Sequence, residues 1–137
     1  MSKILSLLSC LAVSGALCGT LHAAEQRYPT KPIRVIIPTT PGGGSDQVVR
    51  MLGQKFTAAW GQQVVVDHRP GAGMTIGIDI GAKATPDGHT LIMVNPSHAI
   101  NATLYPKLPY DPVRDLTPIT VLVTQAYGVV VPNSLPV

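Results

Sequence analysis

The sequence predicts an α/β fold with a mostly parallel sheet. Three features support this class: short apolar runs rich in β-branched residues, a helical spacing of apolar residues after the first run, and clusters of glycine and proline between the segments. Strand and helix units in alternation form parallel sheets with helices on their faces. The loops that enter the helices then gather at the carboxyl edge of the sheet, where ligands bind in such folds.

The first strand and helix have clear sequence signals. Residues 33–37 form an apolar run that predicts a buried strand, and the glycine and proline cluster 38–44 ends it. Ser45 or Asp46 is expected to cap the following helix, and Gly61 to end it. The apolar residues of this helix recur at helical spacing: Val48, Val49, Leu52, Phe56 and Ala59.

A second unit repeats the pattern less clearly. Residues 64–66 predict a strand, 67–73 a turn and 74–84 a helix. The isoleucines in 74–84 alternate with period two, so this segment is also compatible with a strand. Residues 90–94 predict a third strand.

Beyond Pro96 the pattern weakens into a short helical or loop stretch and the proline-rich segment 104–112. Two further apolar runs follow at 119–123 and 127–131, and the last is expected to be a strand that leads into a turn. No closing element comes after it. We therefore expect a truncated chain, in which residues 25–137 are one incomplete domain.

Residues 1–24 resemble a secretory signal peptide. Lys3 precedes the apolar run 4–13, small residues follow, and cleavage is expected after Ala23 or Ala24. The alternative is a retained membrane anchor, but the run is short against the roughly 20 apolar residues that a span needs. We expect the segment to be removed and the protein to be exported.

Composition excludes several kinds of protein. Both cysteines, Cys10 and Cys18, lie in the expected signal peptide, so the mature chain has no thiol chemistry. Loss of Lys3 reduces the 10 basic residues to 9 against 7 acidic ones, a net charge of 9 − 7 = +2. The basic residues are scattered, which argues against binding of nucleic acid. We expect no metal, no cofactor and no enzymatic activity, because neither a metal-ligand pattern nor a catalytic motif is visible.

Three loops at the expected carboxyl edge carry the candidate binding residues. The loop 39–46 offers backbone amides and hydroxyls at a helix N-terminus, which suits a carboxylate or phosphate. The loop 67–73 adds glycines to the same edge, and the loop 95–98 adds a hydroxyl and an imidazole. The candidates in these loops are Thr39, Thr40, Gly42, Gly43, Gly44, Ser45, Asp46, Gly71, Gly73, Ser97 and His98.

Each of these features also has a structural interpretation. The loop 39–46 is compatible with a plain strand-to-helix turn, in which Asp46 is a cap. A histidine without a visible partner, such as His98, is more often structural than catalytic. Gly71, Gly73 and Gly77 only approximate a dinucleotide-binding motif, because the spacing is GxGxxxG.

Six sequence blocks in order resemble the substrate-binding proteins of tripartite tricarboxylate transporters, the Bug family. The blocks are YPTKPIRVIIP (28–38), PGGGSD (41–46), HRPGAG (68–73), PDGHTL (86–91), SHAIN (97–101) and LYPKLPYDP (104–112). The resemblance implies a type II periplasmic-binding-protein-like lobe, truncated before the second lobe. It also implies capture of a small organic carboxylate in the periplasm and its delivery to the membrane permease subunits of the transporter.

The resemblance further implies which residues bind. Residues 39–46 and the turn from Gly71 to Met74 match the loops that hold a ligand carboxylate, partly through ordered water. Ser97 and His98 match a loop that borders the cleft. The sequence departs from the family at Thr39, where many relatives have an aromatic residue, and at Met74, where a further glycine is common.

Two other classes of protein remain open from the sequence. A Rossmann-like half-domain of a nucleotide-binding enzyme would bind nucleotides rather than carboxylates. A secreted module that binds only a protein partner would bind no small ligand.

Overall fold

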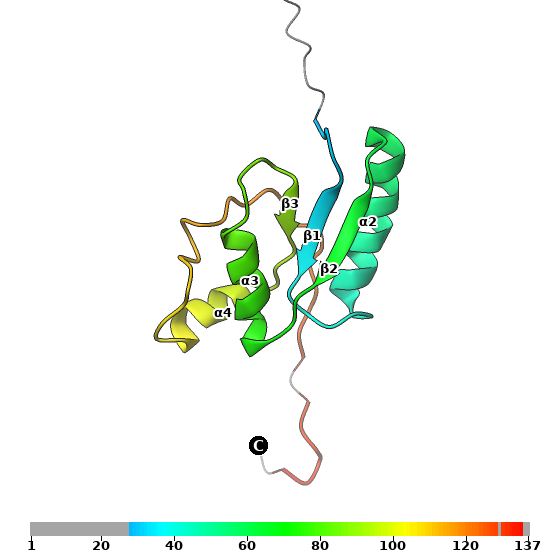
Figure 1. Ribbon diagram of the computed structural model, residues 1–137. Coiled ribbons are helices and arrows are strands. Elements are labelled where there is room, and N and C mark those ends of the chain that lie inside the picture. Colours follow the sequence, from blue (N-terminus) through cyan, green and yellow to red (C-terminus); the bar gives the residue numbers. More distant parts are fainter. Residues whose placement is uncertain (1–27, 129, 136–137) are drawn as a thin grey trace, which may run out of the picture.

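The computed structural model describes residues 28–128 and 130–135, so the expected signal peptide lies outside the described residues. Three strands, β1 (Ile33–Ile37), β2 (Val64–His68) and β3 (Thr90–Ile92), form one parallel sheet in the order β2-β1-β3. β1 is therefore the central strand (Figure 1). The predicted α/β class with a parallel sheet is confirmed.

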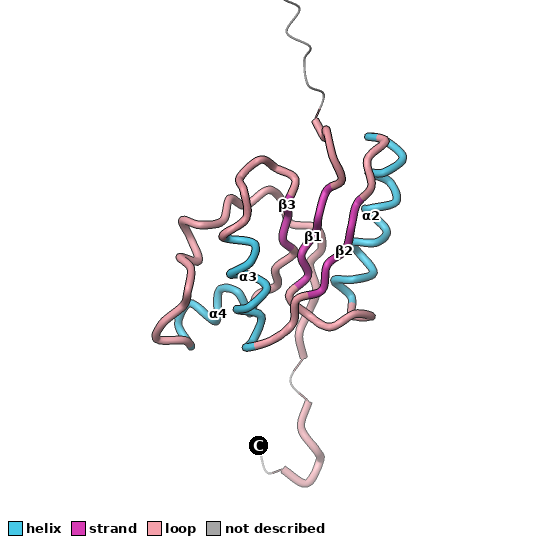
Figure 2. The backbone as a smooth tube through the Cα atoms, viewed as in Figure 1, coloured by secondary structure: helices cyan, strands magenta, loops and turns pink. Residues whose placement is uncertain are grey.

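Helices flank the sheet on both sides. Helix α2 (Gly44–Trp60) lies beside β2, and helices α3 (Thr75–Ala82) and α4 (Ser97–Leu104) lie on the side of β3 (Figures 1 and 2). A single 3-10 turn, η1 (Ala72–Met74), leads directly into α3. The helix predicted at 74–84, rather than the alternative strand, is thus confirmed.

Alternation along β1 explains the two-sided core. Ile33, Val35 and Ile37 pack with Val49 of α2 in one buried cluster. A second cluster, formed by Met74, Ile78 and Tyr110, lies on the α3 side. Burial of each large apolar side chain stabilises the fold by about 1.5–3 kcal/mol. The two clusters hold the helix N-termini at fixed positions relative to the strand ends.

Several element boundaries differ from the sequence prediction. Helix α2 begins at Gly44 after an N-cap at Gly43, so neither Ser45 nor Asp46 caps it; Gly61 ends it in the left-handed conformation, as predicted. Strand β2 continues through residues 67 and 68, because these pair with Ile36 and Ile37. The predicted turn therefore begins two residues too early.

The later apolar runs were predicted less well. β3 ends at Ile92 rather than at residue 94. No strand forms within 119–128 or 130–135, and the last apolar run is not a strand over the residues described. Ile119 and Val121 are each 77% exposed. Within 28–128 and 130–135, no helix has the length and apolarity needed to cross a membrane.

Candidate functional site

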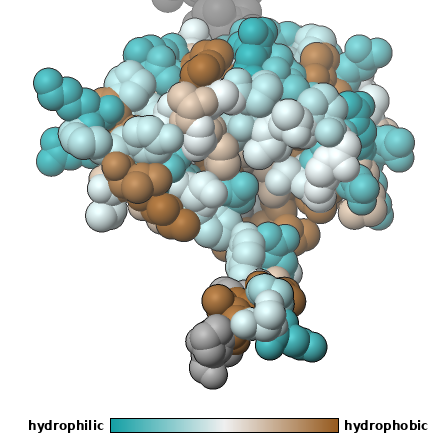
Figure 3. All heavy atoms as spheres, turned by 90° about the horizontal axis from the view of Figure 1, so that it is seen from below, coloured by the Kyte–Doolittle hydropathy of each residue, from teal (hydrophilic) through white to brown (hydrophobic). Residues whose placement is uncertain are grey.

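The carboxyl ends of β1, β2 and β3 meet at one edge of the sheet. All three strands are parallel, so the loops that follow them start side by side. Backbone bonds fix these starts: the amide of Arg69 donates to the Ile37 carbonyl (2.9 Å), and the amide of Met93 donates to the Ile36 carbonyl (2.9 Å). Figure 3 views the molecule from this edge, where hydrophilic and hydrophobic residues are intermixed.

The loop 39–46 presents fewer free amides than expected. The amide of Gly42 donates to Asp46 Oδ2 (3.0 Å), so this candidate amide is already used. The amides of Gly44 and Ser45 lie in the first turn of α2, where helix geometry supplies no carbonyl partner. They point out of the positive end of a 17-residue helix. The anion-binding capacity of the loop therefore rests on the remaining amides at the start of α2, those of Gly43, Gly44 and Ser45, and on the nearby hydroxyls.

The carboxylate of Asp46 faces the protein and is buried, with 6% of the residue exposed. Besides the Gly42 amide, it accepts a hydrogen bond from Arg50 Nε (2.7 Å). The hydrogen bond from Gly42 holds the pKa of Asp46 below its ordinary value; burial opposes this, and Arg50 and His68 lower the pKa further. Asp46 thus fixes the shape of the loop from the first turn of the helix rather than from the cap position.

His68, at the end of β2, contacts this loop at two points, and the sequence did not reveal it as a site residue. Its Nδ1 lies 3.0 Å from the carbonyl oxygen of Thr39, and its Nε2 lies 3.1 Å from Asp46 Oδ1. It therefore connects both ends of the loop 39–46 to the neighbouring strand. The only local signal was that two polar residues, Asp67 and His68, follow the three valines of this strand.

The turn 71–74 has an unusual backbone. Gly71, Ala72, Gly73 and Met74 all have positive φ, at 131°, 46°, 62° and 82°. The Met74 amide closes the turn on the Gly71 carbonyl (2.9 Å). Non-glycine residues in this region of φ cost of order 1–3 kcal/mol. The left-handed backbone at Met74 thus gives a physical reason why glycine suits this position.

One side chain of α4 and the close approach of α3 to the strand ends hold the turn 71–74 in place. Asn101, buried in α4, donates from Nδ2 to the Gly73 carbonyl (2.6 Å). A Cβ at Gly77 would lie 2.7 Å from the Arg69 carbonyl oxygen and 2.7 Å from Pro38 Cβ. Only a glycine allows α3 to approach both strand ends so closely. The first two candidate loops are therefore packed against each other.

The third loop differs from the prediction. The amide of Ser97 donates to Asn95 Oδ1 (2.9 Å), which orders the start of α4. His98 Nε2 lies 3.1 Å from the Pro112 carbonyl oxygen, and its ring lies nearly parallel to that of Tyr110. Burial, together with the charge of Asp79, raises the pKa of Tyr110. His98 thus binds the segment 110–112, which fits the structural interpretation of a lone histidine.

Arg69 and Asp67 flank His68 and form their own ion pairs. Asp67 accepts hydrogen bonds from Arg34 Nε (2.8 Å) and from Arg69 Nε (2.9 Å). Burial acts to raise the pKa of Asp67, but the bonds from the two arginines lower it below its ordinary value. Arg69 therefore forms an ion pair with Asp67 beside the candidate site.

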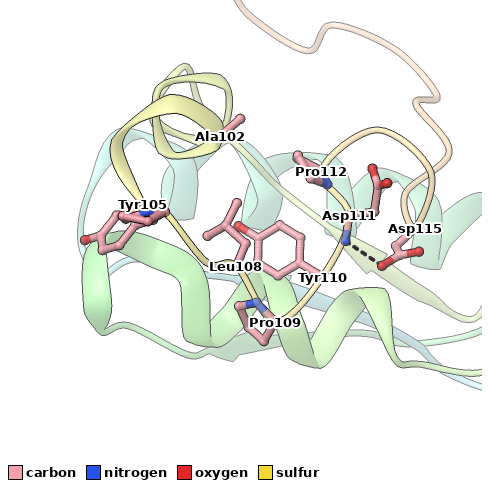
Figure 4. Close-up of a pocket in the computed structure, with 9 residues that line it drawn as sticks. Ala102, Tyr105, Leu108, Pro109, Tyr110, Asp111, Pro112 and Asp115 are labelled. Atoms are coloured by element: carbon pink, nitrogen blue, oxygen red, sulfur yellow. Dashed lines mark hydrogen bonds between the residues drawn. The ribbon is translucent and has the colours of Figure 1, made fainter.

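Two hollows lie away from the candidate residues. One, of about 510 Å³, borders the proline-rich segment (Figure 4), where the Asp111 amide donates to Asp115 Oδ2 (2.7 Å). Another, of about 610 Å³, lies between α2 and β2. No predicted site residue lines either one. Among the described residues, no group of three His, Cys, Asp or Glu side chains could hold a metal ion.

Known proteins resemble this chain in sequence. The family model "Tripartite tricarboxylate transporter family receptor" matches residues 48–137. A UPF0065 protein from the tcbD-tcbE intergenic region of a Pseudomonas species is 39% identical over 105 residues, which cover 77% of this chain and 31% of that protein. Protein BugT of Bordetella pertussis is 34% identical over 124 residues, covering 89% of this chain and 37% of BugT.

Solved structures agree with these matches. MatC from Rhodopseudomonas palustris, solved with bound malate, is 35% identical with a TM-score of 0.65, over 69% of this chain and 33% of MatC. The periplasmic binding protein BugD is 33% identical with a TM-score of 0.61, over 64% of this chain and 29% of BugD. The chain thus spans about a third of the length of these relatives. From its sequence and its fold, the chain belongs to the tripartite tricarboxylate transporter receptor family.

Proposed function

We propose that this chain is part of a periplasmic receptor that captures small organic carboxylates for a tripartite tricarboxylate transporter. The observation that carries the proposal is the joining of the loop 39–46 and the turn 71–74 at one sheet edge, beside the N-terminus of α2. Unpaired amides at a helix N-terminus favour anions through hydrogen bonds and the helix dipole. One carboxylate of the ligand would bind there.

The relatives support a carboxylate rather than another anion. MatC was solved with malate, and a second R. palustris protein, 34% identical to this chain with a TM-score of 0.59, was solved with adipate. Both ligands are dicarboxylates of small size. The permease subunits of the transporter, the periplasmic location and the removal of residues 1–24 are parts of the same proposal, supported by the family and by the N-terminal sequence.

Within the site we assign different roles to the candidate residues. Thr39, Thr40, Gly43, Gly44 and Ser45 border the ligand carboxylate, and Gly71 to Met74 form the opposite wall. Gly42 and Asp46 act by shaping the loop, because they are bonded to each other. Ser97 and His98 lie at the margin, since the Ser97 amide is bonded to Asn95 and the His98 ring to the Pro112 carbonyl.

The test is a thermal-shift and calorimetric screen of the chain against mono-, di- and tricarboxylates, with nucleotides as negative controls. MatC with malate, run beside it, shows that the assay detects binding by a relative. A ligand that binds only the folded state raises the unfolding temperature. Stabilisation by a nucleotide, or by none of the carboxylates, would contradict the proposal.

A matched pair of variants locates the site. Gly44→Val adds a side chain beside the free amides at a position where a Cβ meets nothing within 4 Å. We expect it to weaken carboxylate binding about tenfold or more, as for the loss of one charge-assisted hydrogen bond. Gly128→Val makes the same change in equally open space at a residue outside the candidate loops and should bind like the parent chain. Equal affinities for the two variants would place the ligand elsewhere.

A further inference from the structure

His68 lies in a closed environment that restricts its protonation. Its side chain is 13% exposed, and that of its partner Asp46 is 8% exposed. The two ring nitrogens face the Thr39 carbonyl oxygen at 3.0 Å and Asp46 Oδ1 at 3.1 Å. Both distances are those of good hydrogen bonds.

Both atoms that face the ring are acceptors. A backbone carbonyl has no proton to give, and the carboxylate of Asp46 is ionised at neutral pH, because its pKa lies below the ordinary value. A neutral imidazole donates from one nitrogen only, so its other nitrogen would point a lone pair at an oxygen. Only the imidazolium donates to both oxygens.

The other described histidines have different surroundings. At His89, Nε2 accepts from the Thr30 amide (3.2 Å) and Nδ1 donates to the Asp87 carbonyl (3.0 Å), which suits the neutral ring. At His98, Nε2 faces the Pro112 carbonyl, and Nδ1 is buried without a partner in the described structure. Of these three rings, only that of His68 faces two acceptors.

We propose that His68 is held as the imidazolium and is a positioning residue that fixes the loop 39–46 for carboxylate binding. This inference rests on the proposed function and adds a charge to it. Asp46 (−1) is paired with Arg50 (+1) and His68 (+1), which leaves a net charge of +1 beside the loop 39–46. Deprotonation of His68 would reduce this sum to 0 and leave one of the two bonds that tie the loop to β2.

The charged groups around His68 support this sum. From α2, Asp46 contacts the ring and is itself paired with Arg50, and the contact from the loop after β1 is a backbone carbonyl. Asp67 and Arg69, its neighbours in sequence, pair with each other and with Arg34. Carboxylate affinity should therefore be highest where His68 is charged and should fall as the pH rises.

The first test needs no ligand. Nitrogen-15 NMR of histidine-labelled protein at about pH 7.5, where an unperturbed histidine is mostly neutral, reports which ring nitrogens carry protons. We expect two protonated nitrogens at His68, a neutral ring protonated at Nδ1 for His89, and a neutral ring protonated at Nε2 for His98. The variants His68→Gln and His89→Gln assign the signals. A neutral ring at His68 would overturn the proposal, whatever the protein binds.

The second test is the pH profile of carboxylate affinity between about pH 6 and about pH 9. The parent chain should lose affinity about tenfold as the pH rises, on the scale of one charge near a protein surface. His68→Gln should bind weakly with a flat profile, and His68→Lys should recover part of the affinity. His89→Gln, at the opposite end of the sheet, should keep the parent profile.

The outcomes separate the two proposals. A parent affinity that stays constant while the NMR signals show His68 losing its charge would overturn the positioning role. An absence of carboxylate binding at every pH would overturn the proposed function, while two protonated nitrogens at His68 would still support the assignment of the charged ring. If His68→Gln fails to fold, the NMR signals of the parent chain decide.

Discussion

The loop 39–46 and the turn 71–74 occupy the same sheet edge but are stabilised differently. The loop 39–46 is held by hydrogen bonds between ionised groups, centred on Asp46 with Arg50 and His68. The turn 71–74 is held by close packing around Gly77 and by one hydrogen bond from the side-chain amide of Asn101. The first loop should therefore respond to pH, and the second to the size of side chains.

This difference separates two properties of a binding site. Ionised hydrogen bonds are directional and depend on the protonation of each partner. Close packing depends on volume and is insensitive to pH. A site built from both kinds of wall can change its affinity with pH while it keeps its shape.

The largest expected effect is that of Gly77→Ala on the turn 71–74. The new Cβ would lie 2.7 Å from the Arg69 carbonyl oxygen, a backbone atom that cannot rotate away. Overpacking of this kind costs about 1–3 kcal/mol. The free energy of unfolding in urea measures it. Gly44→Ala is the control: its Cβ meets no atom within 4 Å, so it should be neutral or slightly stabilising. Equal stability of the two variants would contradict the close contact.

Asn101→Ala should have a smaller effect on the same turn. It removes the bond to the Gly73 carbonyl and leaves that carbonyl to water, because Gly73 itself is exposed. The expected loss is about 1 kcal/mol, measured by thermal unfolding. Faster amide hydrogen exchange at residues 73 and 74 should accompany it. The exposed residue Gln54 of α2 provides the control, and Gln54→Ala should change neither quantity.

Met74→Gly has two opposing effects on stability, so its net effect should be smaller than either one alone. Glycine relieves the left-handed φ of 82°, worth about 1–2 kcal/mol, but removes a buried side chain worth about 1.5–3 kcal/mol. The two effects largely cancel in the free energy of unfolding. Met74→Val keeps the backbone strain and loses packing, so it should be clearly less stable than Met74→Gly. The reverse order would show that the turn does not keep its left-handed form.

The smallest expected effect is a change of slope at acid pH from Asp46→Asn. The folded-state pKa of Asp46 is lowered from 3.8, so its stabilisation is complete above about pH 4 and is lost as the pH falls through the folded pKa. The stabilities of Asp46→Asn and the parent should therefore converge as the pH falls. Urea unfolding at a series of acid pH values measures this. Lys31→Gln, the control, breaks the exposed ion pair between Lys31 and Asp87. The pKa of Asp87 is lowered to about 2, so the stability of this variant should change with pH in parallel with that of the parent near pH 4.

Local signals predicted much of the fold. The apolar run 33–37 is the whole of β1, and Gly61 ends α2 because its φ of 70° suits glycine. Breakers and periodicity act within a few residues, so they can be recognised without knowledge of the tertiary structure. The grouping of the first two loops at one edge also followed, since it depends only on parallel strands.

Features that depend on distant residues could not be predicted. β2 includes Asp67 and His68 because their backbone pairs with Ile36 and Ile37 of β1. Their side chains are bonded to residues of other elements: Arg34, Asp46 and Thr39. The occupied amide of Gly42 and the orientation of His98 toward Pro112 have the same origin. The apolar run 119–123 forms no strand and is largely exposed, which its apolar pattern alone did not indicate.

The left-handed backbone of Met74 has an evolutionary consequence. Where strain and burial nearly cancel, substitutions between glycine and a flexible apolar residue are almost neutral for folding. Selection for stability then exerts little control over this position, and mutations can accumulate there. Because residue 74 closes the turn 71–74, relatives can diverge in the shape of that turn while their folds remain equally stable.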